Sequence, residues 1–251
     1  MRTLIFLDLD DTLFQTARKC PPGEEVTAVS FSKTGEAISY MTALQQYFLE
    51  WLGSDATLIP TTGRSLETFR RVRLPFTGPA IVNHGATVFN PDGSRDELWH
   101  AHIQAQLEGT RADLERLLCA AVTFSDTREL GVDLYWEGEA DLPLYLVAKH
   151  RGLELGKLEQ LRQFWLLETA KLESVYLFAN GNNVSILPKA ISKRAAVAYL
   201  LEREKRVGPL LSIGLGDSIS DLEFMSLCNF VMMPSRGQLF DALPRDRHAF
   251  R

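Results

Sequence analysis

The sequence opens with MRTLIFLDLDDTLF (residues 1–14), where an apolar run over residues 3–7 is closed by acidic residues. An uninterrupted run of this kind predicts a strand of a parallel sheet, because such strands are covered on both faces. Asp8 and Asp10 follow directly, and residues two apart on an extended segment point the same way. Since ligands bind at the carboxyl ends of strands in an open α/β sheet, these carboxylates could share a cation and act as nucleophile and general acid–base.

A second polar group, Thr62-Gly63-Arg64, follows the apolar residues 56–59, which predict another strand. Glycine lets the backbone approach an anion closely, and threonine offers a hydroxyl donor. Taken alone, the tripeptide is more often an ordinary turn between a strand and a helix. Arg64 is either a substrate contact or a residue on the helix surface.

Late in the chain, a lysine and two acids also follow predicted strands. Lys193 begins a helix predicted over residues 192–205, and Asp217 and Asp221 follow an apolar run at residues 210–215. The two acids are one helical turn apart, and hard oxygen ligands at a strand end suit Mg²⁺. Taken alone, each group is readily explained as a helix cap or a solvated charge, but together they predict one site.

In the order acid, hydroxyl, lysine and acid, these four groups resemble the four motifs of the haloacid dehalogenase superfamily. The resemblance covers residues 1–84 and about 188–233. It implies that Asp8 is the nucleophile and forms an aspartyl-phosphate, and that Asp10 protonates the leaving alcohol and then activates water. An aspartate at this second position is the phosphatase and phosphomutase version of the motif, since dehalogenases of the family lack it.

The resemblance also implies roles for the remaining candidates. The phosphate-binding hydroxyl and lysine would be Thr62 and Lys193. Further candidates for contacts with phosphate or substrate are Thr12, Gly63, Arg64 and His84, and His84 is equally explained as a packed, hydrogen-bonded histidine. The ligands of Mg²⁺ would be Asp8, the main-chain carbonyl of Asp10, and Asp217, with Asp221 bound directly or just behind them. Ser220 stands where many relatives carry asparagine, so its hydroxyl would reach less far toward a phosphate.

The fold class expected is α/β, with a doubly wound, mostly parallel sheet and an inserted smaller α+β cap. Residues 1–85 and 188–251 would form the catalytic core, and residues 86–187 the cap that sets substrate specificity. The cap is expected because the order of elements changes there to α-β-β-α-β-β, with a hairpin signal at Asn180-Gly181-Asn182-Asn183. Periodic apolar residues predict helices over residues 38–52 and 99–122.

Within the superfamily, the inserted segment resembles the cap of the sugar-phosphatase branch. VSILPK (residues 184–189) resembles sucrose-phosphate phosphatases, and NHGA (residues 83–86) resembles trehalose-phosphate phosphatases. The function implied is a Mg²⁺-dependent phosphatase acting on a small phosphorylated metabolite, with a sugar phosphate as the expected class. The alternatives are a phosphomutase or phosphotransferase using the same residues, and a non-catalytic phosphate-binding or signalling protein on this fold.

Composition limits the partners. The net charge of -5 argues against a general affinity for nucleic acid, which needs a basic surface. The chain has no apolar stretch near the roughly 20 residues of a membrane span, and its N-terminus is too acidic for a signal peptide. The cytoplasm is the expected location.

Overall fold

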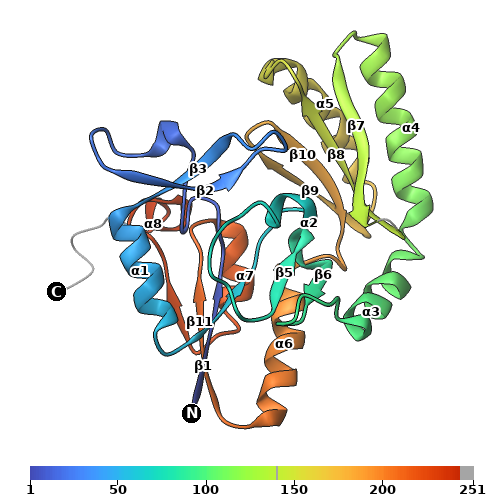
Figure 1. Cartoon of the computed structure of the whole chain (residues 1–251). Helices are drawn as coiled ribbons and strands as arrows, with labels where there is room; N and C mark the ends of the chain where they lie inside the picture. The colour runs from blue at the N-terminus through green and yellow to red at the C-terminus, as the bar shows by residue number, and fades with distance from the viewer. Residues whose placement is uncertain (140, 244–251) are drawn as a thin grey trace, which may run out of the picture. The chain divides into compact units, whose positions relative to one another are not determined.

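The computed structural model describes residues 1–139 and 141–243 and divides the chain into two compact units (Figure 1). The core unit comprises Met1–Asp96 and Lys193–Arg251, and the inserted unit comprises Glu97–Ser192. The core unit is therefore discontinuous in sequence, and the inserted unit interrupts it once.

Both boundaries lie later than the sequence suggested. The first lies after Asp96 because β6 (Thr87–Phe89) still pairs with β5 (Ala80–Val82) of the core unit. Asp96 is buried and accepts hydrogen bonds from Tyr199 and Arg203 of helix α6 (Lys193–Val207), which hold the end of this segment in the core unit. The second boundary lies after Ser192, since β10 (Asn183–Pro188) pairs along its whole length within the inserted unit.

The core unit is built on a four-stranded sheet in the order β12-β11-β1-β4. All neighbouring strands are parallel, and their bounds are Phe230–Met232, Leu210–Leu215, Arg2–Leu7 and Thr57–Pro60. Side chains on both faces of β1 are buried, from Leu4 to Leu7, as the uninterrupted apolar run predicted. The parallel α/β class expected from the sequence is confirmed.

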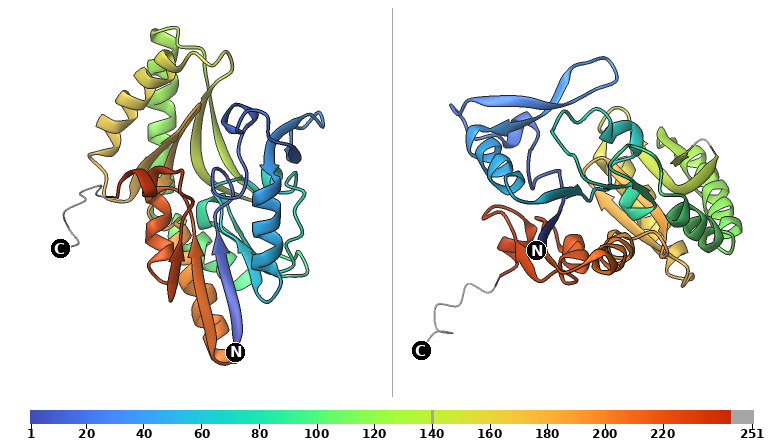
Figure 2. Two further views of the ribbon diagram at one scale, coloured as in Figure 1. Left: turned by 90° about the vertical axis from the view of Figure 1, so that its left-hand side faces the viewer. Right: turned by 60° about the horizontal axis from the view of Figure 1, so that its bottom comes forward.

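Helices cover both faces of this sheet. Helix α1 (Ala43–Gly53) lies on one face, while α6 (Lys193–Val207) and α7 (Leu222–Met225) lie on the other (Figure 2). Leu49 and Leu52 of α1 belong to the same apolar cluster as residues of β1 and β4. The remaining core helices are short: α2 (Leu66–Phe69) and α8 (Gln238–Asp241).

The predicted helix over residues 38–52 is only partly correct. Residues Ala37–Thr42 form strand β3, which pairs with β2 (Val26–Phe31) in a hairpin that the sequence did not predict. The helix begins after Thr42, whose side chain accepts a hydrogen bond from Gln45 N while the Gln45 side chain accepts one from Thr42 N. This reciprocal cap gives hydrogen-bond acceptors to the backbone N–H groups of Thr42 and Gln45, which have no partner within the helix. The helix therefore begins after Thr42, where the strand ends.

Strand β5 pairs antiparallel with β6 and reaches the segment after β4 through a single parallel bridge between Thr61 and Ile81. Among the helices of the described residues, none combines the length and apolar character needed to cross a bilayer.

The inserted unit is an antiparallel sheet with helices packed on it. Its strands follow the order β7-β8-β10-β9, with bounds Val132–Glu139, Leu142–His150, Asn183–Pro188 and Val175–Asn180. Helices α4 (Arg111–Thr127) and α5 (Leu155–Thr169) lie side by side on one face of it (Figure 2). The helix predicted over residues 99–122 is interrupted, because α3 (Glu97–Leu107) ends before Gly109 and α4 begins after Thr110.

Trp165 of α5 is fully buried in the apolar cluster of the inserted unit, among side chains such as Leu117 and Ile186. We expect Trp165→Ala to lower the free energy of unfolding by about 3–5 kcal/mol, because it removes a large ring and leaves a cavity. Urea denaturation followed by circular dichroism measures the loss. Leu167→Ala is the matched control in the same helix, since Leu167 is 69% exposed. Equal stability of the two variants would contradict this packing.

Candidate active site

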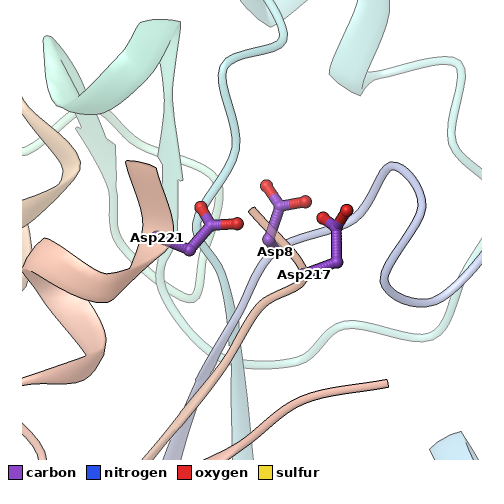
Figure 3. A group of neighbouring side chains, drawn as sticks. All are labelled: Asp8, Asp217 and Asp221. Atoms are coloured by element: carbon purple, nitrogen blue, oxygen red, sulfur yellow. The ribbon is translucent and has the colours of Figure 1, made fainter. Parts of the chain in front are cut away.

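Parallel pairing of β1 with β11 brings two acidic segments to one edge of the core sheet. Leu7 is paired with Leu215, and Asp8 N donates to Leu215 O at 2.8 Å, so Asp8 and Asp217 emerge beside each other. The carboxylates of Asp8, Asp217 and Asp221 are all buried, and an oxygen of each lies within 4.8 Å of the others (Figure 3).

Lys193 lies against this group of three carboxylates. Its ammonium nitrogen donates to Asp8 Oδ1 at 2.6 Å and to Asp221 Oδ1 at 2.7 Å. The other oxygen of Asp221 accepts hydrogen bonds from the backbone N–H and the hydroxyl of Ser218, at 3.1 and 2.7 Å. Lys193 is the first residue of α6, so these hydrogen bonds join the start of that helix to the segments that follow β1 and β11.

The charges of the group are unequal, because Lys193 supplies one positive charge against three carboxylates. Burial raises the pKa of Asp8 to about 7, although Lys193 opposes this rise. Burial and then the charge of Asp221 raise the pKa of Asp217 to about 6. Burial lowers the pKa of Lys193, but the two carboxylates outweigh it and the net shift is upward.

A divalent cation would stabilise these carboxylates in their ionised form. Three buried carboxylates whose oxygens converge are the oxygen-only ligand set that hard cations such as Mg²⁺ take, and this set fits such an ion. The side chain of Asp10 is not a member of this group. A cation shared by the carboxylates of Asp8 and Asp10 therefore stays a prediction.

Thr12 lies within the acidic group. Its hydroxyl is 3.1 Å from Asp217 Oδ1 and 3.4 Å from Asp8 Oδ2, and it donates to these carboxylates. The turn that places Thr12 there passes through Asp11 with a φ of 62°, in the left-handed region. The sequence analysis gave Thr12 as a candidate contact of phosphate or substrate. In the structure, its hydroxyl is hydrogen-bonded to Asp8 and Asp217.

Two loops of the core unit are joined where Thr62 and His84 lie. The backbone of Thr62 donates to Ile81 O at 2.9 Å and accepts from His84 N at 3.2 Å. A Cβ on Gly63 would come within 2.5 Å of the His84 ring, so the close approach of the two loops requires glycine there. Burial, followed by the charge of Lys193, lowers the pKa of His84 to about 3, which keeps its ring neutral.

Arg64 does not lie free on a helix surface. Its Nε and Nη2 donate to the two carboxylate oxygens of Asp10, each at 2.7 Å. Its Nη1 donates to the hydroxyl of Ser30 at 2.9 Å, and its guanidinium carbon lies 5.1 Å from the centre of the Phe14 ring. Sequence reasoning missed Ser30 and Phe14, because Ser30 belongs to the hairpin that it did not predict.

No family model matches the chain. Its structure is similar to that of the trehalose-6-phosphate phosphatase C-terminal domain of C. albicans, with a TM-score of 0.57 and 15% sequence identity, over 90% of this chain and 73% of that one. A sucrose-phosphatase from Synechocystis, solved with sucrose and phosphate, matches with a TM-score of 0.53 and 19% identity, over 92% and 83%.

A haloacid dehalogenase-like hydrolase from Bacteroides thetaiotaomicron matches with a TM-score of 0.51 and 12% identity, over 93% of this chain and 94% of that one. At such low identities the likeness concerns the fold and not the individual residues. The parallel core sheet, the separate antiparallel sheet and these matches agree with one another. The chain therefore has the fold of the haloacid dehalogenase-like hydrolases, in the form found in sugar-phosphate phosphatases.

Proposed function

We propose that the protein is a Mg²⁺-dependent phosphatase that hydrolyses a phosphomonoester through an aspartyl-phosphate on Asp8. The observation that carries this proposal is the Asp8 carboxylate at a strand end, 2.6 Å from the Lys193 ammonium and grouped with two more buried carboxylates. Phosphoryl transfer depends mostly on positioning and on neutralising charge, and both are provided around Asp8.

Two chemical steps account for the reaction. An oxygen of Asp8 attacks phosphorus, the bond from phosphorus to the leaving oxygen breaks, and Asp10 gives its proton to that oxygen to release an alcohol. Water then attacks the phosphorus, the bond from phosphorus to Asp8 breaks, and Asp10 takes the proton from the water. One water is consumed, and an alcohol and inorganic phosphate are released.

Lys193 and Thr62 would bind the phosphoryl oxygens. A lysine ammonium has three donors, and Lys193 uses two of them on Asp8 and Asp221, so one is left for an equatorial oxygen. Thr62 is buried after β4, and its hydroxyl, which accepts from Arg64 N, still has its own proton to donate. Donors fixed in this way stabilise the charge that spreads over the transferring group.

The metal ligands in this proposal are Asp8, the main-chain carbonyl of Asp10, and Asp217, with Asp221 beside them. When bound, Mg²⁺ supplies charge neutralisation, which lets an anionic carboxylate approach an anionic phosphate. The raised pKa values of Asp8 and Asp217 accompany the geometry, since burial is the main cause of both shifts and the charge of Asp221 adds to it.

The inserted unit would select the substrate, for which we propose a sugar phosphate. Helices α4 and α5 pack on one face of its sheet, and the opposite face carries hydroxyl and carboxylate groups on large side chains. Tyr145 pairs with Glu137 across β7 and β8, and burial followed by the charges of Glu137, Tyr135 and Tyr176 raises the pKa of Tyr145 well above its usual range. Aromatic rings with polar ends suit a hydroxyl-rich ligand.

Asp8→Asn should abolish turnover while the fold stays intact, because it removes the nucleophile at nearly constant shape. We expect phosphate release to fall by more than roughly 1000-fold. The assay is a panel of sugar phosphates and other phosphomonoesters, with product analysis to separate hydrolysis from transfer to a sugar. Asp55→Asn, an exposed acid of the same unit, is the control and should retain full activity. Activity of Asp8→Asn within tenfold of the wild type would rule out this mechanism.

Mg²⁺ should stabilise the folded protein as well as support turnover. At about 100 times its Kd it should add about 2.7 kcal/mol to the free energy of unfolding, because only the folded chain brings the carboxylates together. Thermal unfolding with Mg²⁺ and with chelator measures this. Asp217→Asn should lose most of the shift and Asp55→Asn should keep it. A wild type with no thermal shift and chelator-resistant activity would contradict the metal assignment.

Changes on the polar face of the inserted sheet should alter substrate preference more than phosphate chemistry. Glu137→Gln should raise KM for the preferred sugar phosphate roughly tenfold, the effect of one charged hydrogen bond of about 1.5 kcal/mol. Hydrolysis of p-nitrophenyl phosphate should change less than about twofold, since this substrate has no sugar hydroxyls. Glu115→Gln, on the exposed surface of α4, is the control. Equal effects on both substrates would argue against this assignment.

A further inference from the structure

We infer that Arg64 is a positioning residue that holds the Asp10 carboxylate in the orientation needed for proton transfer. This inference rests on the proposed function, in which Asp10 exchanges protons with the leaving oxygen and with water. It replaces the expectation from the sequence that Arg64 contacts the substrate.

The contact between the two side chains is a two-point contact. Arg64 Nε and Nη2 each donate to a different oxygen of Asp10 at 2.7 Å. A single hydrogen bond would let the carboxylate turn about it, whereas two parallel bonds from a planar guanidinium fix both the plane and the distance of the carboxylate. The Asp10 side chain is 45% exposed and that of Arg64 only 14%, so the arginine is the fixed partner and the acid is the one that needs holding.

Arg64 is itself fixed by contacts that do not involve Asp10. Nη1 donates to Ser30, a fully buried residue of β2, and the guanidinium lies over the buried ring of Phe14. Its backbone N–H donates to the Thr62 hydroxyl at 3.1 Å, and its backbone oxygen accepts from Asn83 N at 2.7 Å. The side chain is thus held at its tip and at its base.

The hairpin that carries Ser30 is in turn joined to the segment after Arg64. Ser30 forms a β-bridge with Val72, and Phe31 N donates to Arg71 O at 3.2 Å. Ser30 is therefore held by backbone pairing, and its hydroxyl is a stationary acceptor for Nη1. The chain of contacts runs from the β2–β3 hairpin through Arg64 to Asp10.

The same geometry makes a substrate contact by Arg64 unfavourable. The edge formed by Nε and Nη2 can bind a phosphate or carboxylate with two parallel bonds, but Asp10 already occupies it, and Nη1 donates to Ser30. For Arg64 to bind a substrate through this edge, it would have to release Asp10 and leave that carboxylate without its two donors. A fixed Asp10 is what a general acid requires, since proton transfer depends on hydrogen-bond reach to the leaving oxygen.

If Arg64 positions Asp10, the loss of kcat/KM on changing Arg64 should depend on the leaving group. If Arg64 only bound the substrate phosphate, it should not. A proton from Asp10 matters when the leaving oxygen is strongly basic, as in glycerol 2-phosphate, and matters little for p-nitrophenyl phosphate, whose phenolate leaves without one. The comparison uses kcat/KM, which covers the steps up to departure of the leaving group. It thereby leaves out the later hydrolysis step, which is common to all substrates.

The experiment measures kcat/KM of full-length wild type, Arg64→Lys, Ser30→Ala and Asp10→Asn with both substrates and Mg²⁺. Arg64→Lys keeps the positive charge and loses the two-point contact. We expect it to lose roughly 100-fold on glycerol 2-phosphate, within the range of general acid catalysis, and less than about threefold on p-nitrophenyl phosphate. Ser30→Ala should show a smaller loss of the same selective kind. A double variant that combines both changes is also measured. When Asp10→Asn is already present, adding Arg64→Lys should change kcat/KM very little, because the two residues act as a unit.

Arg71→Lys is the matched control, since Arg71 also binds the hairpin, through Phe31 O at 3.0 Å, but does not touch Asp10. It should leave both rates unchanged. Equal losses on the two substrates in Arg64→Lys, or losses additive with Asp10→Asn, would overturn the role of Arg64 while leaving the phosphatase intact. A wild type that releases phosphate from neither substrate, nor from the sugar-phosphate panel, would overturn the proposed function and this role with it.

Discussion

The hydrogen bonds of Lys193 to Asp8 and Asp221 are the interaction on which the arrangement of the site depends. They join three segments far apart in sequence: the residues after β1, the start of α6 and the helical turn after β11. Removing water from charged groups is costly, and a buried charge left without its partner destabilises a protein by about 3–5 kcal/mol. The lysine offsets that cost for two of the carboxylates, and this leaves the surplus charge that a divalent cation would neutralise.

Much of this arrangement could be predicted from the sequence, because its determinants are local. The mostly apolar runs before Asp8 and before Asp217 predict parallel strands, and parallel neighbours end at the same edge of the sheet. The acids placed at those ends therefore meet, whatever lies between them in sequence. Lys193 differs, because α6 follows β10 of the antiparallel sheet and not a strand of the core sheet. Its contacts with Asp8 and Asp221 therefore do not follow from the position of a strand end.

The features that could not be predicted depend on competition between patterns or on distant partners. Residues 38–42 carry apolar groups that suit a helix, but pairing with β2 and the cap at Thr42 make them a strand. Leu44 and Trp51, two of the apolar residues in that helical pattern, are 75% and 58% exposed. The contact between Arg64 and Ser30 could not be predicted for a related reason, because Ser30 belongs to the hairpin that was not predicted.

Asp8 and Asp10 lie two residues apart, and the structure gives them different surroundings. Asp8 is buried and bound by a lysine within an acidic group, whereas Asp10 is half-exposed and held by an arginine outside that group. Two carboxylates in one site take different chemical roles when their environments differ, and here the difference comes from which cation each one meets. The lysine contact leaves Asp8 beside the acids that could hold a metal, as the proposed role of nucleophile requires. The arginine contact lies outside that acidic group, and the Asp10 side chain is 45% exposed, which suits the acid and base of the proposed mechanism.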